Sequence, residues 1–245
     1  VPTRQPQQRM VQTFFETYSK YRDSVFYDAS AWSVANFYNI DYRPLRSASL
    51  GEEVTDLSNL FPVAPVARSE YAYLIDWNDY NAPALLHRLQ SEGLVLASAF
   101  KPFTTRVDGK EMAFDAGTLV LPVRQQSHPS EKVYELLQAA HQELGVPAFA
   151  VHSGYHLKGI DLGSRYVQPL RKPKAAMLIG EGIRSYEAGE VWHLLDTRVG
   201  MPITKLPLRD FDRIRLDGYN TLVLVSGRYD LDEKQEPLGA LYIGG

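Results

Sequence analysis

The residue pair with the spacing of a metal-binding motif is His128 and Glu131. A His-x-x-Glu sequence supplies two zinc ligands in some hydrolases, but the site also requires a third ligand and an open coordination position. The alternative is structural: Ser130 caps the helix that follows, and Glu131 favours the positive end of that helix. Because no third ligand accompanies the pair, we predict no metal site in this chain.

Two further histidines, His152 and His156, are four residues apart, a spacing that places side chains on one face of a helix. A predicted strand precedes them, however, and Gly154 lies between them. We therefore expect a loop here and no shared metal ligation.

A glycine-rich turn, Gly180-Glu181-Gly182, lies where a predicted strand meets the N-terminus of a predicted helix. Free N–H groups and the helix dipole suit such a place to an anion. The acidic residues argue against phosphate, and the three-glycine dinucleotide pattern is absent. The alternative is that the glycines serve only the turn. If this region binds a ligand, the candidate residues are Gly180, Glu181, Gly182, Ser185, Glu187, Ser226 and Gly227.

Acid–base or nucleophilic groups are not arranged in a recognisable motif. Glu190 and His193 are three apart on a predicted helix, the spacing of a common surface pair. Ser226 follows a strand, as in a nucleophile elbow, but the G-x-S-x-G pattern is missing. We therefore predict no catalytic residue in this chain.

Composition narrows the possible functions. The 245 residues are 44% hydrophobic and 22% charged, with a net charge of -3 and no cysteine. These values are typical of a globular protein, and they exclude disulfides, thiolate ligands and a cysteine nucleophile. A nucleic-acid partner is not expected, because there is no basic excess. No apolar run is long enough to cross a membrane.

The elements expected to position these groups follow from hydrophobic spacing. An opening helix is predicted from Val11, Phe14, Phe15, Tyr18 and Val25, followed by short helices and loops and a linker at residues 62–65. Residues 71–77 then predict a strand, 82–92 a helix, 94–100 a strand, and Asp108-Gly109 a hairpin turn. A strand at 118–121, a helix at 130–144 and a strand at 149–151 complete a first α/β unit.

A second unit begins at residue 174. Strands are predicted at 175–179, 201–206 and 221–225, with a helix from Tyr186 to Val199 whose apolar residues Val191, Leu194 and Leu195 cover the sheet. Strands alternating with helices predict an α/β fold with an open, mostly parallel sheet and helices on both faces. We expect three regions: a helical and irregular segment at 1–68, a first α/β unit at 69–172 and a second at 173–245. The last lacks a closing helix, which predicts truncation.

Residues 174–207 (KAAMLIGEGIRSYEAGEVWHLLDTRVGMPITKLP) and 217–227 (DGYNTLVLVSG) resemble a domain that follows the catalytic domain in bacterial zinc carboxypeptidases of the carboxypeptidase A-like class. That domain is similar to class I glutamine amidotransferases, with a flavodoxin-like sheet that often lacks the catalytic residues. Residues 2–16 (PTRQPQQRMVQTFFE) and 73–89 (YLIDWNDYNAPALLHRL) resemble the segments that join the two domains.

The resemblance implies a non-catalytic accessory or substrate-positioning region of a zinc-dependent metallocarboxypeptidase. Zinc would then belong to the parent peptidase domain, which would be a partner together with a peptide or cell-wall substrate. The parent would be secreted or periplasmic, and the first residues indicate a chain cut from a longer product. The alternative is a small-molecule-binding or hydrolase domain with its site at the carboxyl ends of the strands.

Overall fold

The computed structural model describes residues 3–16, 33–38, 40–47, 51–52, 55, 65–229 and 240–242. The chain divides into two compact units, Val1–Pro62 and Val63–Gly245. The larger unit contains strands and helices in alternation, and the fold is of the α/β class.

The N-terminal unit contains two short helices, α1 (Gln8–Thr13) and α2 (Val34–Phe37). The N–H of Ala35 donates to the carbonyl of Phe14 over 3.0 Å, and the hydroxyl of Tyr42 donates to the carbonyl of Phe15 over 2.8 Å. The opening helix ends at Thr13 and is shorter than the sequence predicted. Tyr18, Val25 and residues 62–64 of the predicted linker lie outside the described residues.

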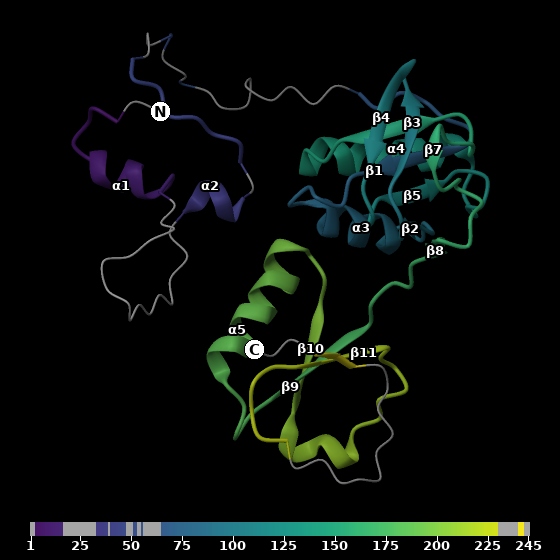
Figure 1. Ribbon diagram of the computed structural model, residues 1–245. Coiled ribbons are helices and arrows are strands. Elements are labelled where there is room, and N and C mark those ends of the chain that lie inside the picture. Colours follow the sequence, from purple (N-terminus) through teal and green to yellow (C-terminus); the bar gives the residue numbers. More distant parts are fainter. Residues whose placement is uncertain are drawn as a thin grey trace. The chain divides into compact units, whose positions relative to one another are not determined.

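The first sheet has five strands in the order β6 (Ala148–Val151), β1 (Ala72–Ile75), β5 (Leu119–Pro122), β2 (Ala97–Ala99) and β8 (Val167–Pro169) (Figure 1). Every pair of neighbours is antiparallel. The prediction of a mostly parallel sheet is thus wrong for this unit.

The physical reason lies in the crossovers. Helix α3 (Ala82–Ser91) connects β1 to β2, and α4 (Ser130–Leu144) connects β5 to β6. The two strands that each helix joins run in the same direction, but a third strand lies between them. This is the split βαβ arrangement of ferredoxin-like topologies. The order of helices and strands along the sequence is the same whether the two strands joined by a helix are neighbours in the sheet or have a third strand between them.

The two faces of this sheet are covered differently. Buried residues of one face, among them Tyr73, Ile75 and Leu121, pack with Leu85 of α3 and Leu137 of α4. The other face packs against a small antiparallel sheet of β4 (Lys110–Phe114), β3 (Phe103–Val107) and β7 (Lys158–Gly159).

The predicted turn Asp108-Gly109 is confirmed between β3 and β4. Both residues have positive φ, 49° and 78°, as a type I′ hairpin requires. The predicted helix at 130–144 is also confirmed and ends at Gly145 with φ 71°. Its first residue is Ser130, however, and no side chain caps it, so the expected capping role of Ser130 is wrong.

The second sheet is parallel, as predicted, and has the order β10 (Ile203–Pro207), β9 (Ala175–Ile179), β11 (Thr221–Leu224) and β12 (Ala240–Tyr242). Strand β9 has a neighbour on each side and four buried residues. Its alternating side chains feed two clusters: Ala175 and Met177 on one face, Ala176 and Leu178 on the other.

Helix α5 (Ser185–Trp192) covers one face of the parallel sheet and continues as a π-helical segment, η1 (His193–Arg198) (Figure 1). A 3₁₀ helix, η2 (Leu208–Arg213), packs on the other face through Phe211. Val191 and Leu195 contact the core as predicted. Leu194 is 48% exposed, so its predicted place against the sheet is wrong.

Candidate functional site

The predicted ligand-binding residues gather in part at the carboxyl ends of β9 and β11. The turn after β9 pairs with the segment after β11 through an antiparallel bridge between Ile183 and Gly227. The N–H of Arg184 donates to the carbonyl of Ser226 over 2.9 Å, and the N–H of Arg228 donates to the carbonyl of Gly182 over 3.0 Å. The two segments therefore satisfy each other's backbone hydrogen-bonding groups.

Glycine is required where these two segments cross. A Cβ atom on Gly227 would lie 3.0 Å from the carbonyl oxygen of Gly182 and 3.0 Å from the Cα of Ile183. Gly182 itself has φ +83°, a conformation that other L-residues rarely adopt. These glycines thus serve the turn, which is the structural alternative that the sequence left open.

Glu187 holds the second segment from the first turn of α5. Its Oε2 accepts the N–H of Ser226 over 2.8 Å, and its Oε1 lies 3.9 Å from Nε of Arg184. Hydrogen bonds from Ser226, first from its side chain and then from its backbone, lower the pKa of Glu187 below its usual value. The carboxylate is therefore ionised at neutral pH. A general base works best when its pKa lies near the operating pH, so Glu187 is poorly suited to that role.

The remaining predicted residues are Gly180, Glu181 and Ser185. Glu181 and Ser185 are exposed, and their side chains form no hydrogen bond or ion pair with another described residue. Gly180 lies next to the backbone of Leu208 at the start of η2. The structure thus brings together Gly182, Glu187, Ser226 and Gly227. Gly180 belongs to the same turn, because its carbonyl accepts the N–H of Ile183 over 3.2 Å, whereas the side chains of Glu181 and Ser185 do not join the cluster.

His128 and Glu131 are engaged elsewhere. Both carboxylate oxygens of Glu131 accept hydrogen bonds from the guanidinium of Arg68. His128 Nε2 lies 3.1 Å from the carbonyl oxygen of Glu92. No group of three His, Cys, Asp or Glu side chains that could hold a metal occurs among the described residues. The described residues of this chain therefore do not fit a zinc site.

His156 lies in the loop after β6, as predicted. Its ring stacks on Phe103 with centroids 4.2 Å apart, and its Nδ1 contacts the carbonyl oxygen of Ile160. Burial lowers the pKa of His156. His152 in the same loop is exposed, and so are Glu190 and His193 on the C-terminal helix. His156 is therefore held in its loop by the stacking on Phe103 and by Asp161, whose carboxylate accepts the backbone N–H of His156 over 2.8 Å.

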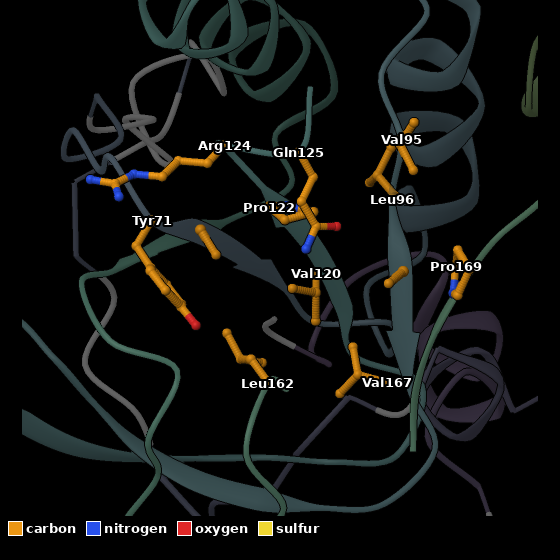
Figure 2. A pocket seen from close by; sticks show the side chains of 12 residues that line it. Tyr71, Val95, Leu96, Val120, Pro122, Arg124, Gln125, Leu162, Val167 and Pro169 are labelled. Carbon is orange, nitrogen blue, oxygen red and sulfur yellow. The ribbon is translucent and has the colours of Figure 1, made fainter. Parts of the chain in front are cut away.

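A cavity of about 230 Å³ lies on the antiparallel sheet, at a place that the sequence did not indicate (Figure 2). Its floor includes Ala72 and Ala97, whose short side chains leave space beside Val120. Leu162 and Val167 form part of its wall. Two small residues in strands, followed by the polar run Arg124-Gln125-Gln126 after β5, are the only sequence signals for it.

The mouth of this cavity is held by Gln126. The side-chain oxygen of Gln126 accepts the N–H of Val95 over 2.8 Å, and its nitrogen donates to the carbonyls of Val95 and Pro122 over 2.8 and 2.7 Å. The N–H of Val123 donates to the carbonyl of Tyr71 over 2.9 Å. Four hydrogen bonds thus fix the segment that carries Arg124 and Gln125.

Comparison of the chain with models of protein families, with curated proteins and with solved structures yields no match. Within the part of the chain that the structure describes, no helix is both long and apolar enough to cross a membrane. Function must therefore be argued from the geometry of these sites.

Proposed function

We propose that this chain is a non-catalytic accessory or substrate-positioning region of a zinc-dependent metallocarboxypeptidase, with a flavodoxin-like, glutamine amidotransferase-like unit at residues 173–245. The parallel order of β10, β9, β11 and β12, with helix α5 on one face, supports that fold. Zinc would be bound by the parent peptidase domain. The parent would act on peptide or cell-wall material and would be secreted or periplasmic.

The observation that carries the proposal is the hydrogen bond between Glu187 and Ser226. Open α/β sheets place ligands and reactive groups at the carboxyl ends of their strands. In this chain that edge is closed by the crossing of residues 182–184 and 226–228, and its carboxylate serves as a hydrogen-bond acceptor with a lowered pKa. The polar groups at this edge stabilise a turn. This use of the polar groups favours an accessory or substrate-positioning role over a catalytic one.

The deciding experiment uses the complete gene product that contains this chain. Release of C-terminal residues from blocked dipeptides is measured with and without zinc. The same measurement is made on a shortened protein that ends before residue 63 of this chain. We expect zinc-dependent release in both proteins, with an increased KM and an unchanged kcat in the shortened one. Circular dichroism would establish that the shortened protein is folded. A complete gene product without zinc-dependent peptidase activity would overturn the proposal.

The second candidate is a small-molecule-binding or hydrolase domain at the same strand ends. It is favoured by one observation: Glu181 and Ser185 are exposed beside the start of α5, where free N–H groups attract polar ligands. Incubation with glutamine and with blocked dipeptides separates the two candidates. Turnover by the chain itself, reduced by Ser226→Ala but not by Ser91→Ala on the exposed surface of α3, would favour this second function.

A further inference from the structure

The cavity on the antiparallel sheet has an apolar interior built by the strand register. Ala97 of β2 lies opposite Val120 of β5 on one side and opposite Pro169 of β8 on the other. The two small floor residues, Ala72 and Ala97, leave a hollow that the β3–β4 hairpin does not fill. Leu162 and Val167 close the far side, as Figure 2 shows. An apolar group of matching size would bury surface here.

The polar side chains that line the cavity are Tyr71, Arg124 and Gln125. In Figure 2 the carboxamide of Gln125 extends over Val120 toward the middle of the cavity, while the side chain of Arg124 starts at the rim and extends past Tyr71, away from the middle. None of the described residues that line the cavity is acidic. Arg124 is exposed and forms no ion pair with any residue that the structure describes. A guanidinium beside an apolar hollow complements a ligand with an apolar body and an anionic end.

Size and rigidity narrow the ligand further. Pockets for drug-sized molecules usually have roughly 300–1,000 Å³. At about 230 Å³ this cavity accommodates one group of amino-acid size. The four hydrogen bonds around Gln126 and Val123 hold the rim segment in place before a ligand arrives, which reduces the entropy lost on binding.

We propose that this cavity binds a small carboxylate with an aliphatic body, the aliphatic part against Ala72 and Ala97 and the carboxylate at the rim beside Gln125, where the exposed side chain of Arg124 turns in to pair with it. The same chemistry is offered by a free aliphatic acid and by the C-terminal residue of a peptide. This site lies on the antiparallel sheet and does not depend on the function proposed for the whole chain.

The test is an NMR titration of the full chain with each probe, in which the backbone amide chemical shifts of Ala97 and Gln125 report binding. The probes are 4-methylpentanoate, N-acetyl-L-leucine, its uncharged amide and a tripeptide that ends in leucine. We expect a Kd on the order of 1 mM for a charged probe of this size and about tenfold weaker binding of the amide. Binding of 4-methylpentanoate identifies a free acid as a ligand, and binding of only the acetylated and peptide probes identifies a peptide end.

Two variants with matched controls test the geometry. Arg124→Gln should weaken the charged probes about tenfold and leave the amide unchanged, whereas Arg106→Gln on the exposed face of β3 should change neither. Ala97→Phe should fill the cavity and abolish binding, whereas Ala113→Phe on β4 should not. If Ala97→Phe does not fold, the surface variant Arg124→Gln still decides. Equal affinities for acid and amide, no binding of any probe, or unchanged binding by Arg124→Gln would overturn the proposal.

Discussion

Glu187 in the first turn of α5 accepts the backbone N–H of Ser226 over 2.8 Å, and this bond joins two segments that are 39 residues apart in sequence. The acceptor is charged, and such hydrogen bonds are stronger than neutral ones. The bond lies beside the bridge between Ile183 and Gly227, so side chain and backbone fasten the same crossing. This crossing closes the carboxyl edge of the parallel sheet.

Removal of the Glu187 carboxylate should destabilise the chain. Glu187→Ala leaves the N–H of Ser226 without its acceptor, whereas Glu187→Gln keeps an oxygen in place and should cost less. Thermal unfolding should give the order wild type, Gln variant, Ala variant, from highest to lowest Tm. Glu190→Ala on the same helix is the control and should change Tm little. Equal Tm values for Glu187→Ala and Glu190→Ala would mean that the hydrogen bond does not stabilise the fold.

The pH dependence of this bond has a definite sign. The folded-state pKa of Glu187 is lowered, so its contribution is fully present above the unfolded value of about 4.3 and is lost as pH falls through the folded value. The difference in Tm between wild type and Glu187→Gln should therefore stay constant at pH 5 and above, and it should shrink as the pH is lowered from about 4.3 to about 2. A difference that stays constant over this range would contradict the assignment of the hydrogen bond.

Local structure was largely predictable from sequence, but the pairing of strands was not. The helix at 130–144, the turn at Asp108-Gly109 and the parallel neighbours of β9 follow from capping glycines, turn chemistry and buried strand patterns. The antiparallel order of the first sheet depends on β5 lying between β1 and β2. That insertion is set by long-range packing, and no local spacing records it.

The candidate sites divide in the same way. Glycine position indicated the turn at Gly180-Glu181-Gly182 and singled out Ser226-Gly227, but the pairing of the two segments through Ile183 and Gly227 was not predicted. The cavity was missed because it is lined by Ala72 of β1 and Ala97 of β2, which are 25 positions apart along the chain and are separated in the sheet by β5. The sequence shows an alanine in a strand as an ordinary core residue, and it does not show whether neighbouring side chains fill the space beside that alanine.

Leu194 and Leu195 should differ sharply in their effect on stability. Leu195 packs with Val191 and Ala188 against the parallel sheet, whereas Leu194 is 48% exposed. Leu195→Ala should cost about 2 kcal/mol, the lower end of the range for a buried leucine, because the side chain is only partly buried. Leu194→Ala should change the free energy of unfolding by about 0.5 kcal/mol or less. Urea denaturation of both variants measures the difference, and a greater loss for Leu194→Ala would reverse the assigned helix face.

His156 should make stability depend on pH below neutrality. Burial lowers its folded-state pKa, so the unfolded chain takes up a proton first as pH falls below about 6.5. Stability from this group is present above that value and is lost as pH falls from it through the folded pKa. The groups that face the ring are Phe103, the carbonyl of Ile160 and the charge of Asp161, which opposes the lowering.

Replacement of this histidine tests the assignment. His156→Phe keeps a ring against Phe103 and should flatten the fall in Tm between pH 7 and pH 5, whereas His152→Phe in the same loop should leave that fall unchanged. The measurement is thermal unfolding in buffers of constant ionic strength. An equally steep fall in His156→Phe would assign the pH dependence to another group.

Two glycines of the second unit should respond oppositely to the same substitution. A Cβ on Gly227 would meet the backbone of Gly182 and Ile183 at 3.0 Å, and backbone atoms cannot move aside as a flexible side chain can. Gly227→Ala should therefore separate the crossing and destabilise the chain by about 1–3 kcal/mol, the usual cost of overpacking. Gly189 lies in α5 with no atom within 4 Å of an added Cβ. Gly189→Ala should stabilise the chain by roughly 0.5–1 kcal/mol, because alanine loses less backbone entropy in a helix. Urea denaturation of both variants, with equal m-values, checks the pair, and a neutral Gly227→Ala would show that the two segments do not cross as closely as their bridge requires.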